Sequence, residues 1–383
     1  MYTILTLNKI SEKGLACFDS QYVCSADTQT PDAVIVRSAS MHDMELPSSL
    51  LAVARAGAGY NNIPVSACTD KGICVFNTPG ANANAVKELV ICALFLTSRR
   101  IVPSVEWCRT LKGNGAEVGK LVEKGKSNFA GPEILGKTLG VYGMGAIGVL
   151  VANAAVALGM NVIGYDPYIS DKAVAALNKS VTLTANADDL FKTADYITLH
   201  APLNDATRGV VNKNSLALAK DGIRVLNFAR GELVDSADII EAVESGKCAA
   251  YATDFPTDAQ LGVDGIIAIP HLGASSPESE ENCAVMAAKQ IRAYLEKGNV
   301  VNSVNLPCIS KENDGANRMT VIASADVQEQ IIAFLNANSI SVNSCECALR
   351  GDVFYGIFDS DQDVTTVLES VRDIDNVIAV RAL

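Results

Sequence analysis

The chain has 383 residues, of which 49% are hydrophobic and 19% charged, and its formal net charge is −12 at pH 7. This length suits two or three domains, since a single hydrophobic core rarely serves more than about 250–300 residues. The negative charge argues against nucleic-acid binding, which depends on Lys and Arg neutralising phosphates, and no apolar run reaches the roughly 18 residues that a membrane span needs.

The N-terminal segment and the cysteines predict a cytoplasmic protein. The segment MYTILTLNKISEKG lacks the basic and apolar regions of a signal peptide. The 11 cysteines are scattered without a CxxC pair, which favours buried thiols over disulfides or a zinc site. Cys345 and Cys347 share one face of a predicted strand, where ordinary packing explains them better than metal binding. We expect neither a metal nor a membrane partner.

The first part of the chain reads as strands alternating with helices. Its segments, in order, are TILTL, EKGLACF, DAVIVR, LLAVARAG, GICVFNTP and ANAVKELVICALFLTSRR. Such alternation predicts parallel strands with helices on both faces. We therefore expect a flavodoxin-like α/β substrate-binding domain over residues 1–99, completed by residues 274–306, whose long apolar helix packs back on it.

A second α/β series follows. The segment from Trp107 to Pro132 is rich in Lys and Gly and lacks a strand, so it reads as an excursion between the two series. Alternation resumes from Gly140 to Pro270, and we expect a Rossmann-type, doubly wound dinucleotide-binding domain over residues 100–273.

The C-terminal tail has a different character. After a predicted linker at residues 307–317, the pattern over residues 318–383 is strand, helix, strand, strand, helix, strand. This order predicts a small α+β domain with an antiparallel sheet and two helices on one face.

A glycine-rich loop lies between a predicted strand and a predicted helix in TLGVYGMGAIGVLVANAAVALG. Gly143, Gly145 and Gly148 form the pattern GxGxxG. The first glycine permits a tight turn, the second lets amides approach a pyrophosphate, and the third lets helix and strand pack closely. The helix N-terminus then faces the anion. A purely structural turn is the alternative, but the flanking strand and helix favour dinucleotide binding.

Asp166 ends the next strand segment, NVIGYD, 18 residues after Gly148. A carboxylate there accepts hydrogen bonds from the adenosine ribose hydroxyls and repels a 2′-phosphate. Because Pro167 and Tyr168 supply no cation, the sequence predicts NAD rather than NADP.

Three further strands end in VLNFARGELVD, AAYATDFPTDAQ and IIAIPHLGAS. The carboxyl ends of parallel strands face the ligand crevice, so Arg230, Asp254 or Asp258, and His271 can converge there. Arginine suits a substrate carboxylate. Histidine, with a pKa of about 6.5, suits removal of a hydroxyl proton, and a carboxylate would orient it.

Simpler interpretations compete with this set. Arg230 could form a surface ion pair, and His271 could be a satisfied histidine at a strand end. His42 in ASMHDME and His200 in YITLHAP are the other histidines, and either could be the base.

The segments FAGPEILGKTLGVYGMGAIG, LHAPLNDATRGVVN, LNFARGELVD and PHLGAS, in this order and spacing, resemble the D-isomer-specific 2-hydroxyacid dehydrogenase family. VRSAS, RAGAGYNNIPV and GICVFNTPGANANAVKELV are similar to its 3-phosphoglycerate dehydrogenase branch. The resemblance covers roughly residues 30–305. The tail resembles ACT-type regulatory domains.

The resemblance implies roles for individual residues. Arg230, Asp258 and His271 are the implied catalytic set, with Arg230 binding the substrate carboxylate and His271 acting as acid/base. Cofactor contacts are implied for Gly143, Gly145, Ala146, Ile147, Gly148, Asp166, Pro167, His200, Ala201, Pro202, Phe228, Ala229, Arg230, Asp254, His271, Gly273 and Ala274. Substrate contacts are implied for Arg37, Ser38, Arg55, Ala56, Gly57, Ala58, Asn82, Arg230 and His271.

The sequence also departs from the family pattern. In the shortened segment TDFPTD, Asp258 stands where relatives carry a glutamate, one methylene longer. Ala58 replaces a common hydroxyl residue, and Lys87 lies where relatives have an apolar or small one. The first turn of the tail, ASADVQ, lacks the Pro-Gly pair of many ACT ligand sites, so inhibition by serine is not carried over.

The implied function is NAD-dependent oxidation of D-3-phosphoglycerate to 3-phosphohydroxypyruvate, the first step of phosphorylated serine biosynthesis. Arg37 and Arg55 would give an acidic protein the local positive field that a phosphorylated acid needs. Alternatives are another D-2-hydroxyacid dehydrogenase, acting on glycerate, hydroxypyruvate or lactate, and an NAD-sensing corepressor-type binding protein. The interleaved domains suggest a homodimer or higher homo-oligomer, with Lys124 and Lys126 reaching the neighbouring site.

Overall fold

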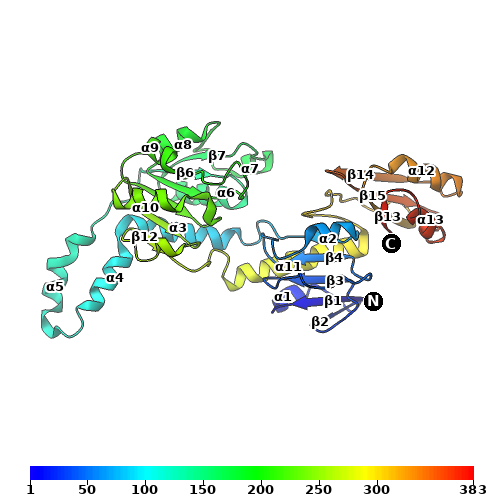
Figure 1. Cartoon of the computed structure of the whole chain (residues 1–383), viewed down its shortest axis with the longest axis horizontal. Coiled ribbons are helices and arrows are strands. Elements are labelled where there is room, and N and C mark those ends of the chain that lie inside the picture. The colour runs from blue at the N-terminus through cyan, green and yellow to red at the C-terminus, as the bar shows by residue number, and fades with distance from the viewer. The chain divides into compact units, whose positions relative to one another are not determined.

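The computed structural model describes all residues, Met1–Leu383, and divides them into two compact units (Figure 1). Unit 1 comprises Met1–Asn82 and Pro277–Leu383, and unit 2 comprises Ala83–Ser276. Unit 1 holds a five-stranded and a four-stranded sheet, and unit 2 a seven-stranded sheet. The predicted fold class, α/β with an added antiparallel domain, is confirmed.

The five-stranded sheet of unit 1 is parallel throughout, with the order β2-β1-β3-β4-β5. This is the flavodoxin-like order 2-1-3-4-5. Its strands are β1 (Tyr2–Leu7), β2 (Tyr22–Ser25), β3 (Ala33–Val36), β4 (Ala52–Arg55) and β5 (Cys74–Phe76). The helices beside it are α1 (Glu12–Leu15), α2 (Val65–Asp70) and α11 (Pro277–Lys297).

One element of the predicted alternation is wrong. The run LLAVARAG, which the alternation treats as a helix, forms β4 between β3 and β5. Its side chains from Ala52 to Ala54 are all fully buried. A short apolar run covered on both faces suits a central parallel strand, and periodicity alone does not distinguish it from a buried helix.

Helix α11 brings the chain back to the first sheet. Its buried residues, among them Ala284, Ala287 and Ile291, share one core with Ile35, Ala54 and other strand residues. A Cβ on Gly14 of α1 would lie 2.4 Å from the Cβ of Ala284, so only glycine permits the contact between α1 and α11. The prediction that this helix packs back on the first domain is confirmed.

The sheet of unit 2 is parallel throughout, with the order β12-β11-β10-β9-β6-β7-β8. The order reverses between β6 and β9, which is the switch point where doubly wound folds bind ligands. The strands are β6 (Thr138–Tyr142), β7 (Asn161–Tyr165), β8 (Val181–Thr184), β9 (Tyr196–Leu199), β10 (Ile223–Asn227), β11 (Cys248–Thr253) and β12 (Ile266–Ala268). The covering helices are α3 (Ala83–Arg99), α6 (Ala146–Ala157), α7 (Asp171–Ala176), α8 (Ala187–Thr193), α9 (Lys213–Leu218) and α10 (Ser236–Glu244), with the 3-10 helices η3 (Gly231–Leu233) and η4 (Asp258–Gln260).

Helix α3 belongs to unit 2, although the predicted first domain extends to residue 99. Its buried residues Val86, Val90 and Leu94 share a core with Val141 of β6 and Val151 of α6. The compact units therefore meet at residues 82/83 and 276/277. The boundary lies before α3 because this helix buries its apolar face on the second sheet.

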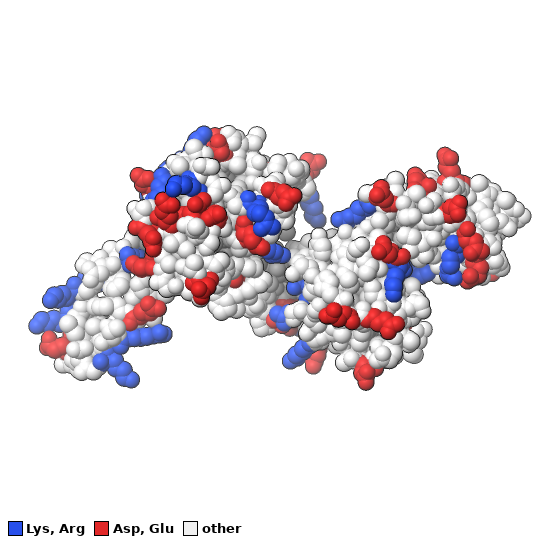
Figure 2. All heavy atoms as spheres, in the orientation of Figure 1, with Lys and Arg blue, Asp and Glu red and all other residues white.

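A helical arm forms the predicted excursion and extends from unit 2 (Figure 1). It consists of α4 (Ile101–Thr110), η1 (Gly115–Glu117), α5 (Val118–Gly125) and η2 (Lys126–Phe129), none of which has a buried residue. The rings of Trp107 and Phe129 pack 5.2 Å apart and hold the two sides together. Basic groups outnumber acidic ones on the arm in Figure 2.

The C-terminal tail has the predicted element order. Its antiparallel sheet runs β14-β15-β13-β16. Both helices contribute to one core, through Ile331 of the first and Val371 of the second, so they cover the same face, as expected. The elements are β13 (Asn317–Ala323), α12 (Gln328–Ala337), β14 (Ser344–Arg350), β15 (Val353–Ser360), η5 (Thr365–Val367), α13 (Leu368–Arg372) and β16 (Val377–Ala382).

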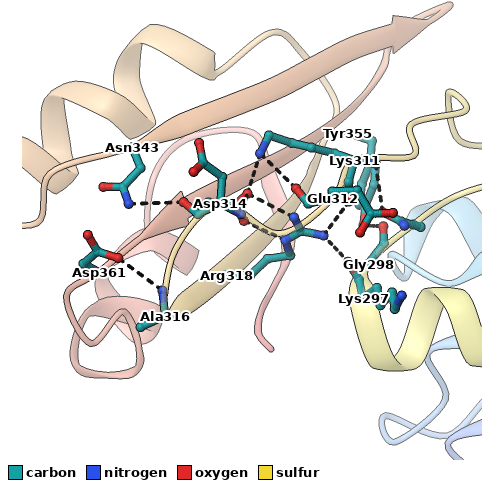
Figure 3. A network of polar contacts seen from close by, with 12 residues as sticks. Lys297, Gly298, Lys311, Glu312, Asp314, Ala316, Arg318, Asn343, Tyr355 and Asp361 are labelled. Atoms are coloured by element: carbon teal, nitrogen blue, oxygen red, sulfur yellow. Dashed lines mark hydrogen bonds and ion pairs between the residues drawn. The ribbon is translucent and has the colours of Figure 1, made fainter.

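Polar contacts tie the segment predicted as a linker to the tail, and Figure 3 shows Lys311, Asp314 and Arg318 among the residues that make them. Asp359 of β15 is fully buried, and its Oδ1 accepts from Arg318 Nε at 2.6 Å. Its Oδ2 accepts from Arg318 Nη2 and Asp314 N, each at 3.0 Å, and from Lys311 Nζ. Arg318 Nη1 also donates to the carbonyl of Lys297, at the end of α11, at 2.7 Å.

We expect Asp359→Ala to lower the stability of the tail by about 3–5 kcal/mol, because it leaves the buried Arg318 without its counter-ion. Hydrogen exchange of the β13 and β15 amides measures the effect. Glu369→Ala removes an exposed pair with Arg372 and serves as control, with an expected loss of about 0.5 kcal/mol or less. Equal exchange in both variants would contradict the assignment.

The same carboxylate makes the tail acid-sensitive. Burial alone would raise the pKa of Asp359, but hydrogen bonds from Arg318 and Lys311 outweigh it and hold the pKa below its ordinary value. The ionised carboxylate therefore contributes fully to the stability of the folded tail above the unfolded-state pKa of about 4. This stabilisation is lost as the pH falls through the lowered pKa of the folded state.

Candidate active site

The glycine loop joins β6 to α6 and brings the backbone segments into close contact. Gly143 has φ +95°, and a Cβ there would lie 2.6 Å from the backbone nitrogen of Ala201. A Cβ on Gly148 would lie 2.0 Å from the carbonyl oxygen of Gly143, whereas one on Gly145 would meet no atom within 4 Å. The first and third glycines are thus required by packing, and the second leaves space above the loop.

The start of α6 faces that space. Gly145 precedes the helix, and Ala146 and Ile147 form its first turn. The first N–H groups of a helix have no intrahelical acceptor and carry the positive end of the helix dipole. With no side chain on Gly145, these groups are accessible to a pyrophosphate.

Asp166 follows β7 and lies beside the same loop. Its Oδ2 accepts from the backbone nitrogen of Met144 at 2.8 Å, and its Oδ1 accepts from that of Tyr168 at 2.9 Å. Pro167 and Tyr168 are exposed. The carboxylate is therefore fixed next to the loop, with remaining acceptor capacity for hydroxyl groups.

His200 follows β9 and leads into Ala201 and Pro202. Its backbone nitrogen donates to the carbonyl of Tyr142 at 2.7 Å, and its Nε2 lies 2.9 Å from Thr198 Oγ1. Nδ1 has no partner and no exposed surface. Burial lowers the pKa of His200 to about 3, so the ring is neutral near pH 7. A neutral, hydrogen-bonded ring fits a residue that lines the cofactor site better than a proton acceptor.

The loops after β10, β11 and β12 contact one another. Asp254 follows β11, and its Oδ2 accepts from the backbone nitrogen of Gly273 at 2.9 Å. The ring of His271 packs on that of Phe255, with centroids 4.4 Å apart. A Cβ on Gly231 would lie 3.3 Å from the Cβ of Phe255. The structure thus gathers the predicted segments Phe228–Arg230, Asp254 and His271–Ala274 at one edge of the sheet.

Asp254 is 2% exposed, yet its Oδ1 has no hydrogen-bond partner. Burial raises its pKa, while the N–H of Gly273 and the charge of His271 act in the opposite direction. A buried acceptor without a donor costs free energy. A bound ligand with an N–H group would satisfy it, which fits a nicotinamide carboxamide.

Arg230 and His271 are both exposed, and neither forms an ion pair. Arg230 Nη1 donates to the carbonyl of Ala229 at 2.6 Å. The surface ion pair that competed with the functional interpretation of Arg230 is therefore absent from the structure.

Asp258 begins η4 and is exposed. Thr257 and Gln260 form a reciprocal capping box around this turn. No hydrogen bond or ion pair joins Asp258 to His271, so the structure does not bring the two together. The role of Asp258 stays a prediction.

Asn227 supports the arginine loop and was missed in the sequence. It is fully buried at the end of β10. Its Nδ2 donates to the carbonyl of Arg230 at 2.8 Å, and its Oδ1 accepts from the backbone nitrogen of Ala229 at 3.2 Å. An amide ending the apolar run IRVLN is a signal that could have identified it.

Unit 1 carries the two arginines of the predicted substrate site at neighbouring strand ends. Arg37 follows β3, Arg55 ends β4, and Arg55 Nε donates to the carbonyl of Arg37 at 3.0 Å. Arg37 Nη2 lies 2.6 Å from Glu280 Oε1 of α11. A Cβ on Gly57 would lie 1.7 Å from Arg55 Nη1, so a side chain at residue 57 would have to displace the guanidinium.

The other predicted substrate residues lie in the segments that follow β3, β4 and β5. The backbone nitrogen of Ser38 donates to Asn8 Oδ1 at 3.0 Å, and the carbonyl of Ala58, after the buried Ala56, accepts from Asn77 Nδ2 at 2.6 Å. Asn82 Oδ1 and Thr78 Oγ1 are buried without hydrogen-bond partners. Thr78 was not singled out in the sequence, although polar residues directly after a buried strand signal such a position.

Comparison with known proteins identifies the second unit. Residues 92–273 match the D-isomer specific 2-hydroxyacid dehydrogenase, NAD binding domain family. This segment is an NAD-binding domain of the D-2-hydroxyacid dehydrogenases. The open space at Gly145 and the unpartnered Asp254 Oδ1 fit that cofactor.

The similarity to two curated relatives covers more of the chain than this domain. The chain is 35% identical over 331 residues to a D-3-phosphoglycerate dehydrogenase of Methanocaldococcus jannaschii, covering 84% of this chain and 60% of that protein. It is 37% identical over 284 residues to one of Mycobacterium leprae, covering 72% and 51%. The chain thus spans only about half to three-fifths of the length of these relatives.

Solved structures agree on the fold. A glyoxylate reductase from Paecilomyes thermophila superposes with a TM-score of 0.66 at 25% identity, over 79% of this chain and 98% of that one. An NAD+-bound 3-phosphoglycerate dehydrogenase of Entamoeba histolytica gives 0.59 at 24% identity, over the same shares, and supports the fold alone. None of the helices is both long enough and apolar enough to span a bilayer.

We expect Asp166→Ala to weaken NAD binding about tenfold or more, since hydrogen bonds to a charged acceptor contribute about 1.5–3 kcal/mol each. Isothermal titration with NAD measures the change. Asp171→Ala, in the exposed first turn of α7, is the control and leaves the affinity unaltered. An unchanged dissociation constant for Asp166→Ala would remove the residue from the cofactor site.

Proposed function

We propose that the protein is an NAD-dependent dehydrogenase that oxidises D-3-phosphoglycerate to 3-phosphohydroxypyruvate. The observation that carries the proposal is the pair of adjacent arginines, Arg37 and Arg55, in a chain whose second unit is a hydroxyacid dehydrogenase NAD domain. The names of the curated relatives support the same substrate. This reaction would supply the 2-oxo acid for phosphorylated serine biosynthesis.

The residues divide the chemistry between them. NAD, when bound, accepts the hydride from C2 of the substrate. Arg230 binds the carboxylate in a two-pronged contact, and Arg37 and Arg55 bind the phosphate. His271 takes the proton from the C2 hydroxyl, so that the C–O bond becomes a carbonyl as the hydride leaves.

Assignment of the proton acceptor follows from the environments of the histidines. His200 is held neutral by burial, and its Nε2 is engaged with Thr198. His271 is exposed and packs on Phe255 next to the loop of Asp254. Only His271 combines an accessible ring with the edge of the sheet where the predicted cofactor residues gather.

A second copy of this chain is the proposed partner, and the arm of residues 101–129 is its contact. The arm has no buried residue, and Ile101 and Val105 of α4 are 42% and 45% exposed. Burial of these apolar groups would favour association. Lys124 and Lys126 would then reach the partner's substrate.

Cellular location and regulation complete the proposal. All eleven cysteines are free thiols, which supports a cytoplasmic location. The strand-helix-strand-strand-helix-strand order of the tail supports an ACT-like regulatory domain.

We expect His271→Asn to lower kcat about 10²- to 10⁴-fold with little change in KM, since it removes general acid–base catalysis but leaves the binding arginines. Formation of NADH from D-3-phosphoglycerate measures the rate. His42→Asn serves as control, because the exposed side chain of His42 makes one hydrogen bond, from Nε2 to the carbonyl of Asn61 at 2.9 Å.

Two results would contradict the proposal. Activity of His271→Asn equal to that of His42→Asn would remove His271 as the acid/base. Reduction of 3-phosphohydroxypyruvate no faster than glyoxylate or hydroxypyruvate by the unaltered protein would exclude phosphate specificity and favour another 2-hydroxyacid substrate.

A further inference from the structure

A carboxylate of the chain itself is bound to one of the two substrate arginines. Glu280 Oε1 lies 2.6 Å from Arg37 Nη2, and the two side chains are 41% and 38% exposed. A carboxylate on a guanidinium makes the same charge-assisted contact that a phosphate oxygen would make. Glu280 therefore uses a donor that the proposed substrate also needs.

The helix that carries Glu280 is fixed to the sheet below it. Gln290 Nε2 donates to the carbonyl of Asn77 at 3.0 Å, and Arg292 Nη2 lies 2.8 Å from Asp19 Oδ2. Along the helix from Glu280, the buried thiol of Cys283 lies within the field of both Arg37 and Arg55. The contact with Arg37, whose backbone carbonyl also accepts from Arg55, places the start of α11 beside the arginine pair.

The energetics suit a displaceable contact. Ion pairs between half-exposed side chains are weak, typically about 0–1 kcal/mol, so a ligand can separate this one. Once a phosphate is bound, the nearby negative charge of Glu280 opposes it.

We propose that Glu280 is a specificity-determining residue that competes with the terminal phosphate of the substrate for Arg37. This inference rests on the proposed function. Glu280 weakens binding of the phosphorylated substrate and of free phosphate, but leaves unchanged the binding of 2-oxo acids that lack a phosphate. It is a positioning residue, because it acts through Arg37.

The variant Glu280→Gln tests this competition, since glutamine keeps the shape but removes the charge. We expect its KM for 3-phosphohydroxypyruvate to fall about two- to fivefold, the range that corresponds to an exposed ion pair. KM for glyoxylate and both kcat values stay constant. The dissociation constant of inorganic phosphate, titrated into the full-length protein, falls by the same factor.

Glu281→Gln is a matched control on the next residue of the same helix. Glu281 Oε2 lies 2.6 Å from Lys13 Nζ, so the variant removes an equivalent charge and an ion pair without touching Arg37. It should leave all KM values and the phosphate affinity unaltered. Equal thermal unfolding temperatures of the two variants show that neither perturbs the fold.

The outcomes separate this inference from the proposed function. An unchanged phosphate affinity in Glu280→Gln, or an equal fall of KM for glyoxylate, overturns the role of Glu280. Failure of the unaltered protein to prefer 3-phosphohydroxypyruvate overturns the proposed substrate instead. In that case tighter phosphate binding by Glu280→Gln still supports competition for Arg37, and unaltered binding refutes it.

Discussion

The close approach of Gly148 to the carbonyl oxygen of Gly143 is the constraint on which the candidate site depends. A Cβ at residue 148 would lie 2.0 Å from that oxygen, so any side chain would push α6 away from β6. This contact brings the start of α6 to the switch point of the seven-stranded sheet. The loop of His200 and Ala201 is fixed by the same turn, because Gly143 also has no room for a side chain against it.

The polar side chains near this turn differ in burial and in hydrogen bonding. His200 has a covered Nδ1 and is neutral, whereas His271 lies exposed on Phe255. Asp254 is buried with one unpartnered oxygen, and Asp166 is held by amides of its own loop and the glycine loop. Groups of the same type thus differ in what they can do, because their burial and hydrogen bonds differ. In unit 1, Arg37 pairs with Glu280, and Arg55 donates to the carbonyl of Arg37.

The sequence predicted what depends on local pattern. The glycine loop, the carboxylate after β7, the element order of the tail and the return of α11 all leave a periodic or spacing signal. The helical expectation for LLAVARAG failed because β4 is buried on both faces and lacks alternation. The assignment of α3 and the contacts Arg37–Glu280 and Arg318–Asp359 depend on residues far apart in the chain, which no local pattern records. No hydrogen bond or ion pair joins Asp258 to His271, the pairing that the resemblance implies; Asp258 begins the turn that Thr257 and Gln260 cap.

Isotopic labelling follows the transfer of hydrogen from C2 of the substrate to the cofactor. The protein would be incubated with NAD and D-3-phosphoglycerate carrying deuterium at C2, and the cofactor analysed by mass spectrometry. We expect reduced cofactor one mass unit heavier, and no such product from deuterated D-lactate under the same conditions. Reduced cofactor without the label, or none from the phosphorylated substrate, would contradict this expectation.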